Sequence, residues 1–122
     1  MLIVYASRTG NTKRFVTKTG LPSQSIDDVR SPSEPFVLVT YTDGAGEVPE
    51  RVRRFLRAHS RVLRGVAASG NRNFGSDFGR AANTIAAEYG VPIVHRFELS
   101  GASSDVEKFK KGVEEIERTC AA

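Results

Sequence analysis

The chain has 122 residues, of which 39% are hydrophobic and 26% charged, and a formal net charge of +4. This length supports one hydrophobic core but not two, so we expect a single domain over residues 1–122. The single cysteine, Cys120, excludes a disulfide framework, a cysteine metal cluster and a cysteine nucleophile site. Strand-like sequence begins at Leu2, and no apolar run approaches the roughly 20 residues that span a bilayer, so we expect a cytoplasmic protein.

Strand-like and helix-like segments alternate along the chain. Apolar or β-branched runs predict strands at residues 2–6, 23–26, 36–41, 65–69 and 92–99. Amphipathic segments predict helices at residues 11–18, 49–59, 77–89 and from 103 onward, and residues 27–35 read as a polar surface loop. The expected caps are Asn11 or Thr12 for the first helix and Ser76 or Asp77 for the third. This alternation predicts an α/β three-layer sandwich, with a five-stranded parallel sheet in the order 2-1-3-4-5 and helices on both faces.

Loops rich in glycine and hydroxyl residues follow the first, third and fourth predicted strands. The carboxyl ends of parallel strands meet at one edge of a sheet, and ligands bind there at the topological switch point. In the predicted order, that point lies beside the first and third strands. We therefore expect the three loops to form one ligand site.

The first of these loops, Ser7-Arg8-Thr9-Gly10-Asn11-Thr12, has the composition of a phosphate cradle. Hydroxyl and backbone N–H groups converge where a helix begins, and Gly10 permits a positive φ and a close approach of the backbone. The hydroxyls of Ser7, Thr9 and Thr12 can each donate a hydrogen bond to a phosphate oxygen. The alternative is an ordinary helix cap rich in serine and threonine.

Several phosphate-handling classes are excluded by residues that the sequence lacks. A phospho-acceptor receiver needs paired carboxylates after the first strand, where this chain has Ser7, Arg8 and Thr9. A tyrosine phosphatase needs a nucleophilic cysteine in the cradle, and none is there. Neither a Walker A motif nor the three-glycine dinucleotide fingerprint is present. We therefore expect a mononucleotide with one phosphate.

The second and third loops suit a flat polar ring. They are Thr42-Asp43-Gly44-Ala45-Gly46-Glu47-Val48-Pro49 and Gly70-Asn71-Arg72-Asn73-Phe74-Gly75. Backbone groups line a ring edge only where side chains do not intervene, and flavin mononucleotide (FMN) fits that description. The Gly44-Ala45 peptide could turn either its C=O or its N–H toward the flavin N5, although a plain turn glycine is the alternative. Phe74 could stack on one ring face or pack on the adjacent helix.

The same residues carry a family resemblance. Ser7-x-Thr9-Gly10-Asn11-Thr12 resembles the flavodoxin phosphate loop. More specifically, three segments resemble the NrdI family, the small flavodoxin-like proteins that accompany class Ib ribonucleotide reductases. These segments are Phe36 to Pro49, Gly65 to Gly75, and Phe97-Glu98-Leu99-Ser100-Gly101. The run from Ser69 to Gly75 is the most specific, and a short basic chain differs from the longer acidic flavodoxins.

The resemblance implies a flavodoxin-like FMN protein whose hydroquinone reacts with dioxygen. It would pass superoxide or a related oxidant to the dimanganese site of the reductase small subunit, where the tyrosyl radical forms. The implied partners are that subunit and a flavin reductase or other electron donor. A general electron-transfer flavodoxin is the alternative, and a flavin-free binding module is a third possibility from another class.

The resemblance also implies which residues surround FMN, with no metal ligands among them. The backbone of Gly44 and Ala45 would lie near N5 and tune the redox chemistry. The phosphate group is expected to meet Ser7, Thr9, Gly10, Asn11 and Thr12. The ring near N5 would be lined by Thr42, Gly44, Ala45 and Gly46, and its edge and face would be held by Ser69, Gly70, Asn71, Phe74 and Gly75. The other residues expected to bind the cofactor are Arg8, Tyr41, Asp43 and Asn73. Some relatives carry an aromatic residue in place of Ala45, so this chain leaves that flavin face more open.

A block of arginines concentrates the positive charge. It contains Arg51, Arg53, Arg54, Arg57, Arg61 and Arg64. The helical stripe of Val52, Phe55, Leu56 and His59 predicts that the first four arginines point away from the core. This surface is either a solvated helix face or a docking surface for an acidic partner. Nucleic acid is not expected because the arginines lack interleaved aromatics, and no membrane partner is expected.

Overall fold

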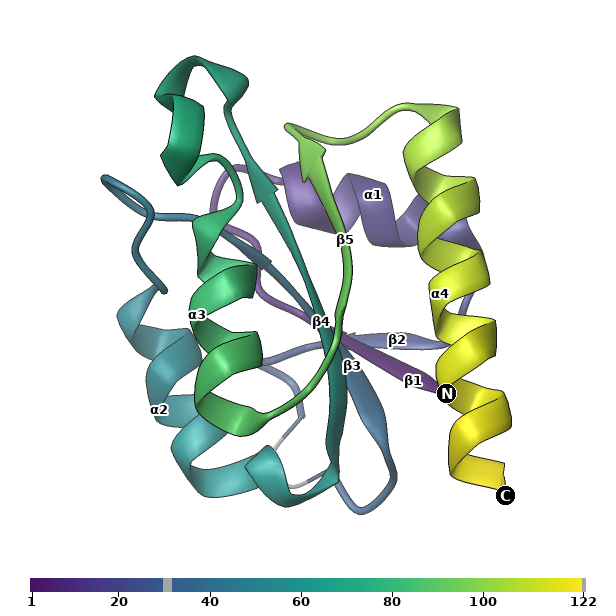
Figure 1. The fold of residues 1–122 in the computed structure, drawn as a ribbon. Coiled ribbons are helices and arrows are strands. Elements are labelled where there is room, and N and C mark those ends of the chain that lie inside the picture. The colour runs from purple at the N-terminus through teal and green to yellow at the C-terminus, as the bar shows by residue number, and fades with distance from the viewer. Residues whose placement is uncertain (30–31, 122) are drawn as a thin grey trace.

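The computed structural model describes residues 1–29 and 32–121, with one parallel sheet at its centre (Figure 1). The sheet has five strands in the order β2-β1-β3-β4-β5. The strands are β1 (Leu2–Tyr5), β2 (Ser23–Ser25), β3 (Phe36–Tyr41), β4 (Leu63–Gly70) and β5 (Ile93–Glu98). Every pairing is parallel, which confirms the predicted strand order. The strand β4 begins two residues before its predicted start at Gly65.

Helices cover both faces of the sheet. They are α1 (Asn11–Thr19), α2 (Glu50–His59), α3 (Arg80–Tyr89) and α4 (Ser103–Ala121), with short 3-10 helices η1 (Ser60–Val62) and η2 (Arg72–Asp77). In Figure 1, α2 and α3 lie on one side of the sheet, and α1 and α4 lie on the other. The three predicted layers are therefore present. Within the described residues, none of these helices combines the length and apolar character that a membrane span requires.

Each face of the sheet has its own apolar core. On the α1 and α4 face, the rings of Phe15 and Phe97 stack with centroids 3.8 Å apart, and Phe109 meets Phe15 edge-on. On the other face, Leu38 from β3 packs in one cluster with Val52 and Ile85. The strand β3 is buried at nearly every position, as its almost entirely apolar sequence predicts.

The predicted cap of α1 is wrong. Gly10, with φ 91°, precedes the helix, and Asn11 is already its first residue. Thr12 lies inside the first turn, where its buried hydroxyl donates to the carbonyl of Ala6. The hydroxyl oxygen of Ser7 instead accepts from the N–H groups of Gly10 (3.1 Å) and Lys13 (3.4 Å), so an earlier residue supports this helix end.

The predicted start of α3 at Ser76 or Asp77 is also wrong. Much of the third loop is the 3-10 helix η2, and α3 begins after Gly79, which has φ 61°. The cause is a close crossing of two backbone segments, because a Cβ atom on Gly70 would lie 2.6 Å from the nitrogen of Gly79. The residues after Gly70 therefore turn back over the end of β4, and α3 begins only after this turn.

The predicted polar loop at residues 27–35 includes residues 30 and 31, which lie outside the described residues. Before them, Asp27 and Asp28 are exposed while Val29 is buried against the core. The C-terminus of α2 follows the prediction, since the helix ends at His59 and the His59 ring packs on Phe55 at 4.8 Å.

Candidate functional site

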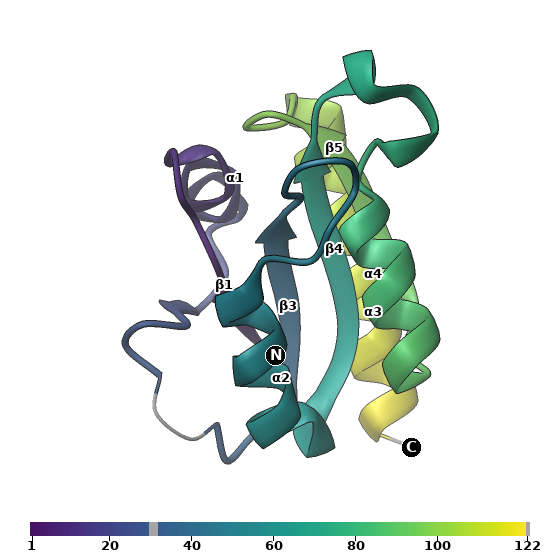
Figure 2. The ribbon, with the colours of Figure 1, turned by 90° about the vertical axis from the view of Figure 1, so that its left-hand side faces the viewer.

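The segments after β1, β3 and β4 lie together at the carboxyl edge of the sheet (Figure 2). They enclose a small polar hollow of about 120 Å³. Its lining comprises Arg8, Thr9, Asn11, Tyr41, Thr42, Gly44, Ser69, Gly70, Asn71, Asp77 and Leu99. All three predicted loops contribute to this lining, and only Asp77 and Leu99 come from outside the predicted set. We refer to this feature as the carboxyl-edge hollow.

The first loop presents a helix N-terminus to the hollow. Thr9 and Asn11 line it, and the Asn11 amide donates to the Thr9 hydroxyl at 3.4 Å. The backbone N–H groups of Asn11 and Thr12 have no acceptor within the helix, because the first turn of any helix leaves its N–H groups free. The partial positive charge of these groups favours an anion at this end of α1.

The second loop is a tight turn held by its own backbone. Asp43 and Glu47 exchange N–H···O=C bonds of 2.8 and 2.7 Å, and Gly46 donates to the Asp43 carbonyl. Gly46 also packs closely on the η2–α3 segment, since a Cβ atom there would lie 2.8 Å from Cδ of Arg80. The Gly44–Ala45 peptide group at the exposed tip has no hydrogen-bond partner among the described residues. That peptide group can therefore turn without breaking a bond.

The third loop is tied to the end of β5. The Ser69 hydroxyl donates to the Leu99 carbonyl at 2.6 Å, and the Leu99 N–H donates to the Gly70 carbonyl at 3.0 Å. Leu99 has φ 54° and is 51% exposed, so its side chain stands at the mouth of the hollow. The Asn71 side chain accepts from the Asn73 N–H at 2.9 Å. The Phe74 side chain lies outside the described residues, and its stacking on the ring stays a prediction.

Ion pairs surround the hollow. Arg8 pairs with Asp43 and links the first loop to the second, and its guanidinium carbon lies 5.0 Å from the centroid of the Tyr41 ring. Asp77 pairs with Arg80 at 3.1 Å. The guanidinium groups of Arg8 and Arg80 are thus compensated by neighbouring carboxylates.

One buried hydroxyl in the hollow has no partner. Oγ1 of Thr42 is buried and makes no hydrogen bond to any described residue. An unsatisfied buried polar group costs roughly 1–3 kcal/mol, so such a group is retained where something outside the chain completes it. Thr42 lines the hollow, which places this unmet bond inside the candidate site.

Some predicted site residues lie beside the hollow instead of on its lining. Gly46 and Thr12 are buried, Ala45 and Gly75 are exposed, and Asp43 contributes through its pairing with Arg8. The remaining predicted residues off the lining are Ser7, Gly10 and Asn73.

Sequence reasoning missed Arg51, and its predicted outward direction is wrong. The side chain reaches from the first turn of α2 to the first loop, where Nη2 donates to the Ser7 carbonyl at 2.6 Å. The long, flexible arginine side chain lets a residue at the start of a helix reach the edge of the sheet. The apolar pattern of a helix shows which face is buried but not how far such a side chain reaches. The available signal was its position two residues after Pro49, at the end of a site loop.

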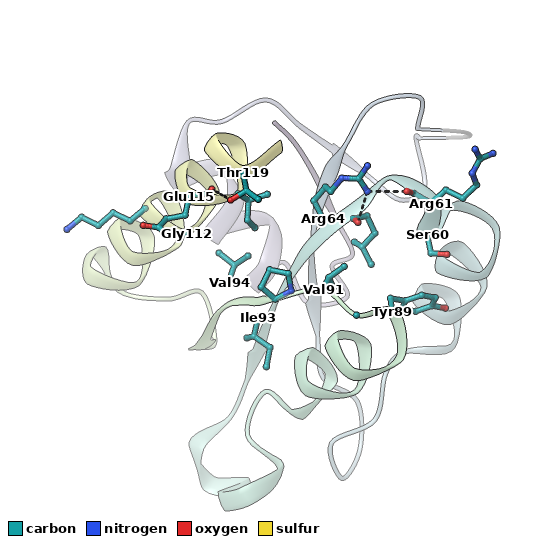
Figure 3. A pocket seen from close by; sticks show the side chains of 15 residues that line it. Ser60, Arg61, Arg64, Tyr89, Val91, Ile93, Val94, Gly112, Glu115 and Thr119 are labelled. Atoms are coloured by element: carbon teal, nitrogen blue, oxygen red, sulfur yellow. Dashed lines mark hydrogen bonds between the residues drawn. The ribbon is translucent and has the colours of Figure 1, made fainter. Parts of the chain in front are cut away.

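A second and larger hollow, of about 860 Å³, lies at the opposite edge of the sheet (Figure 3). We call it the distal hollow. Its lining mixes apolar residues with cations: Ser60, Arg61, Leu63, Arg64, Tyr89, Gly90, Val91, Pro92, Ile93, Val94, Lys111, Gly112, Glu115, Ile116 and Thr119. Nη1 of Arg64 is turned onto the carbonyls of Arg61 and Leu63, both at 3.1 Å. No residue predicted for the ligand site lines it.

Comparisons with known proteins agree on one family. The family model described as NrdI Flavodoxin like matches residues 3–111. The chain is 49% identical to Protein NrdI of Macrococcus caseolyticus, over 95% of this chain and 91% of that protein. It is 47% identical to Protein NrdI of Bacillus licheniformis, over 93% and 88% of the two chains.

Among solved structures, the fold is similar to a short-chain flavodoxin associated with a non-canonical PDU bacterial microcompartment. The TM-score is 0.70 at 20% identity, over 97% of this chain and 96% of that chain. This likeness concerns the fold alone. Because the family model covers most of the chain and the curated relatives are nearly half identical to it, this protein belongs to the NrdI flavodoxin-like family.

Proposed function

We propose that this protein is an FMN-dependent redox activator of class Ib ribonucleotide reductase. In this role it reduces dioxygen to superoxide or a related oxidant, which is used to assemble the dimanganese-tyrosyl radical cofactor of the reductase small subunit. Family membership supports an association with ribonucleotide reductase, and the flavodoxin-like fold supports a flavin. The single observation that carries the site is the unpaired, buried hydroxyl of Thr42 inside the carboxyl-edge hollow.

The donors around the hollow fit a flavin mononucleotide. Free N–H groups at the start of α1 and the hydroxyls of Ser7 and Thr9 suit a phosphate. Glycine backbone at Gly44 and Gly70 suits a flat ring, because no side chain at those positions blocks the ring edge. The first loop itself, Ser7 to Thr12, contains no carboxylate that would repel a phosphate.

When bound, FMN would supply one- and two-electron redox chemistry and reactivity toward dioxygen. The chain's own residues would bind and orient it. Thr42 would donate or accept the hydrogen bond that its hydroxyl lacks, and the first loop would hold the phosphate. The Gly44–Ala45 peptide, free of other partners, would present its C=O or its N–H according to the protonation of the neighbouring ring atom.

The test is reconstitution with the partner. The purified protein should bind FMN; after anaerobic reduction, it is mixed with oxygen and a manganese-loaded small subunit of a class Ib reductase. Electron paramagnetic resonance should then show a tyrosyl radical, which should be absent when the protein is omitted. FMN binding without any radical, together with efficient electron delivery to unrelated acceptors, would support a general electron-transfer flavodoxin instead. A protein that binds no FMN would contradict both functions.

A further inference from the structure

Arg51 joins three segments that are distant in the sequence. From the first turn of α2, its Nη2 donates to the backbone carbonyl of Ser7 at 2.6 Å. Its Nη1 donates to both carboxylate oxygens of Asp27 at 3.0 Å, and its Nε donates to the hydroxyl of Tyr41 at 3.3 Å. One side chain therefore connects the first loop, the segment after β2 and the end of β3.

The contacts of Arg51 are partly sheltered from water. Its side chain is 32% exposed, in contrast to 60% for Arg8, which lines the carboxyl-edge hollow. The hydrogen bond that Arg51 donates to Tyr41 raises the pKa of Arg51, burial lowers it, and Asp27 raises it further, so the net shift is upward. The guanidinium is a fixed cation at this position, with its donors directed by their planar geometry.

Ser7 is the residue through which Arg51 acts on the loop. The Ser7 hydroxyl accepts from the N–H groups of Gly10 and Lys13, on the side of α1. The Ser7 carbonyl accepts from Arg51 on the side of α2. The hydroxyl and the carbonyl of Ser7 are thus both hydrogen-bonded, and the carbonyl bond ties the first loop to Arg51, 44 positions later in the chain.

We propose that Arg51 is a positioning residue for phosphate binding by the first loop. This inference rests on the proposed FMN site. Arg51 fixes the Ser7 backbone so that the N–H groups of the loop already face the phosphate before the ligand arrives, which lowers the ordering cost of binding. Its positive charge beside a loop that holds a phosphate dianion acts in the same direction.

The test compares FMN with riboflavin, which has the same ring but no phosphate. Flavin fluorescence quenching gives the dissociation constants for wild type, Arg51→Gln and Arg51→Lys. Loss of a charge-assisted hydrogen bond predicts roughly tenfold weaker FMN binding by Arg51→Gln, with riboflavin affinity within about twofold of wild type. Arg51→Lys should recover part of the FMN affinity because it keeps the charge but not the planar fork.

Two further variants make the result specific. Arg53→Gln removes a neighbouring arginine of α2 that makes no ion pair among the described residues, and it should leave both affinities unchanged. Asp27→Asn removes the carboxylate that anchors the Arg51 guanidinium but leaves Arg51 in place. FMN affinity should therefore fall less than in Arg51→Gln, again with little change in riboflavin affinity. Thermal melts of the ligand-free variants identify any that do not fold.

The outcomes separate this inference from the proposed function. If wild type binds FMN and Arg51→Gln binds it equally well, the positioning role is wrong while the FMN site stands. Equal loss of FMN and riboflavin affinity would also contradict it, because the effect would then not concern the phosphate. If wild type binds no FMN, the proposed function fails and this inference fails with it.

Discussion

The two hollows at opposite edges of the sheet differ in size and in chemistry, and the smaller one is the better candidate site. The distal hollow is about 860 Å³, and its lining mixes apolar residues with charged ones. The carboxyl-edge hollow is about 120 Å³, yet it contains glycine backbone, a free helix N-terminus and the unpaired hydroxyl of Thr42. Volume shows where side chains leave room, whereas unmet hydrogen bonds show where a ligand is needed.

The strongest way to break this comparison is to disturb the end of β4, where Gly70 lines the small hollow. In Gly70→Val, the new side chain would overlap the backbone of Gly79, which a Cβ alone would approach to 2.6 Å. We expect a loss of about 2 kcal/mol in unfolding free energy and no measurable FMN binding by fluorescence quenching.

The matched control is Gly90→Ala, at the C-terminus of α3. Gly90 has φ 65° and open space around it, so the change strains the backbone without a clash. It should lower stability by about 1 kcal/mol and leave FMN affinity unchanged. Normal FMN binding by Gly70→Val would show that the end of β4 is not part of the site.

A second prediction concerns the hydroxyl that distinguishes the small hollow. Thr42→Val keeps the shape of the side chain and removes Oγ1, which is buried and unpaired. FMN affinity should fall about tenfold, while the ligand-free protein should keep or gain stability because an unsatisfied group is lost. Titration and thermal melts measure the two effects.

Thr40→Val is the control for Thr42→Val, because the Thr40 hydroxyl already donates to the Tyr41 carbonyl at 2.9 Å. It should reduce stability without a selective effect on FMN. If Thr42→Val left FMN affinity intact, the argument from the unpaired hydroxyl would be lost.

A third prediction concerns α4, which connects the two edges. At its start, the Asp105 carboxylate accepts from the Ala102 N–H at 2.7 Å and contacts the His95 ring at 2.7 Å. Partial burial raises the pKa of Asp105, but the Ala102 and His95 hydrogen bonds lower it more, so the net pKa lies below its ordinary value of 3.8. An ionised carboxylate only accepts, so the His95 ring must donate to it.

The sign of the pH effect follows from this lowered pKa. The ionised Asp105 stabilises the fold at pH values above its unfolded pKa, and the contribution disappears as pH falls through the lowered folded pKa. Asp105→Ala should cost about 1 kcal/mol at neutral pH, and the difference from wild type should shrink in strong acid. Urea unfolding at several pH values measures this difference in unfolding free energy. A difference that does not change with pH would contradict the stabilising role of the ionised Asp105.

The smallest effect is expected at the distal hollow. The double variant Arg61→Gln, Arg64→Gln removes two of its cations. FMN affinity should stay within about twofold of wild type, and stability should change by less than about 0.5 kcal/mol, as for most surface substitutions. A tenfold loss of FMN affinity would mean that the larger hollow takes part in binding and would break the comparison.

The sheet order could be predicted from sequence because the strands have strong local patterns. Phe36 to Tyr41 is apolar at almost every position, and Gly20 and Gly90 mark helix ends by their freedom at positive φ. The helix starts were not predictable in the same way. The start of α3 depends on a close approach of Gly70 and Gly79, which only the tertiary structure produces.

The site was predictable where a loop follows a strand, and not where a side chain reaches in from another element. Thr42 and Gly44 lie directly after β3, so the topology places them at the edge. Leu99 reaches the hollow through its bond to Ser69, and Arg51 reaches the first loop beside the hollow through its bond to Ser7. Neither contact has a local sequence signature, because each partner is more than 25 residues away.

The most direct test of the central claim is an NMR titration of the ligand-free protein with FMN, observed through its backbone amides. The account predicts saturable shifts at Asn11, Gly44 and Gly70, which line the carboxyl-edge hollow, with no shift at Ile93 or Lys111 in the distal hollow. Shifts confined to Ile93 and Lys111, or none at all at saturating FMN, would contradict it.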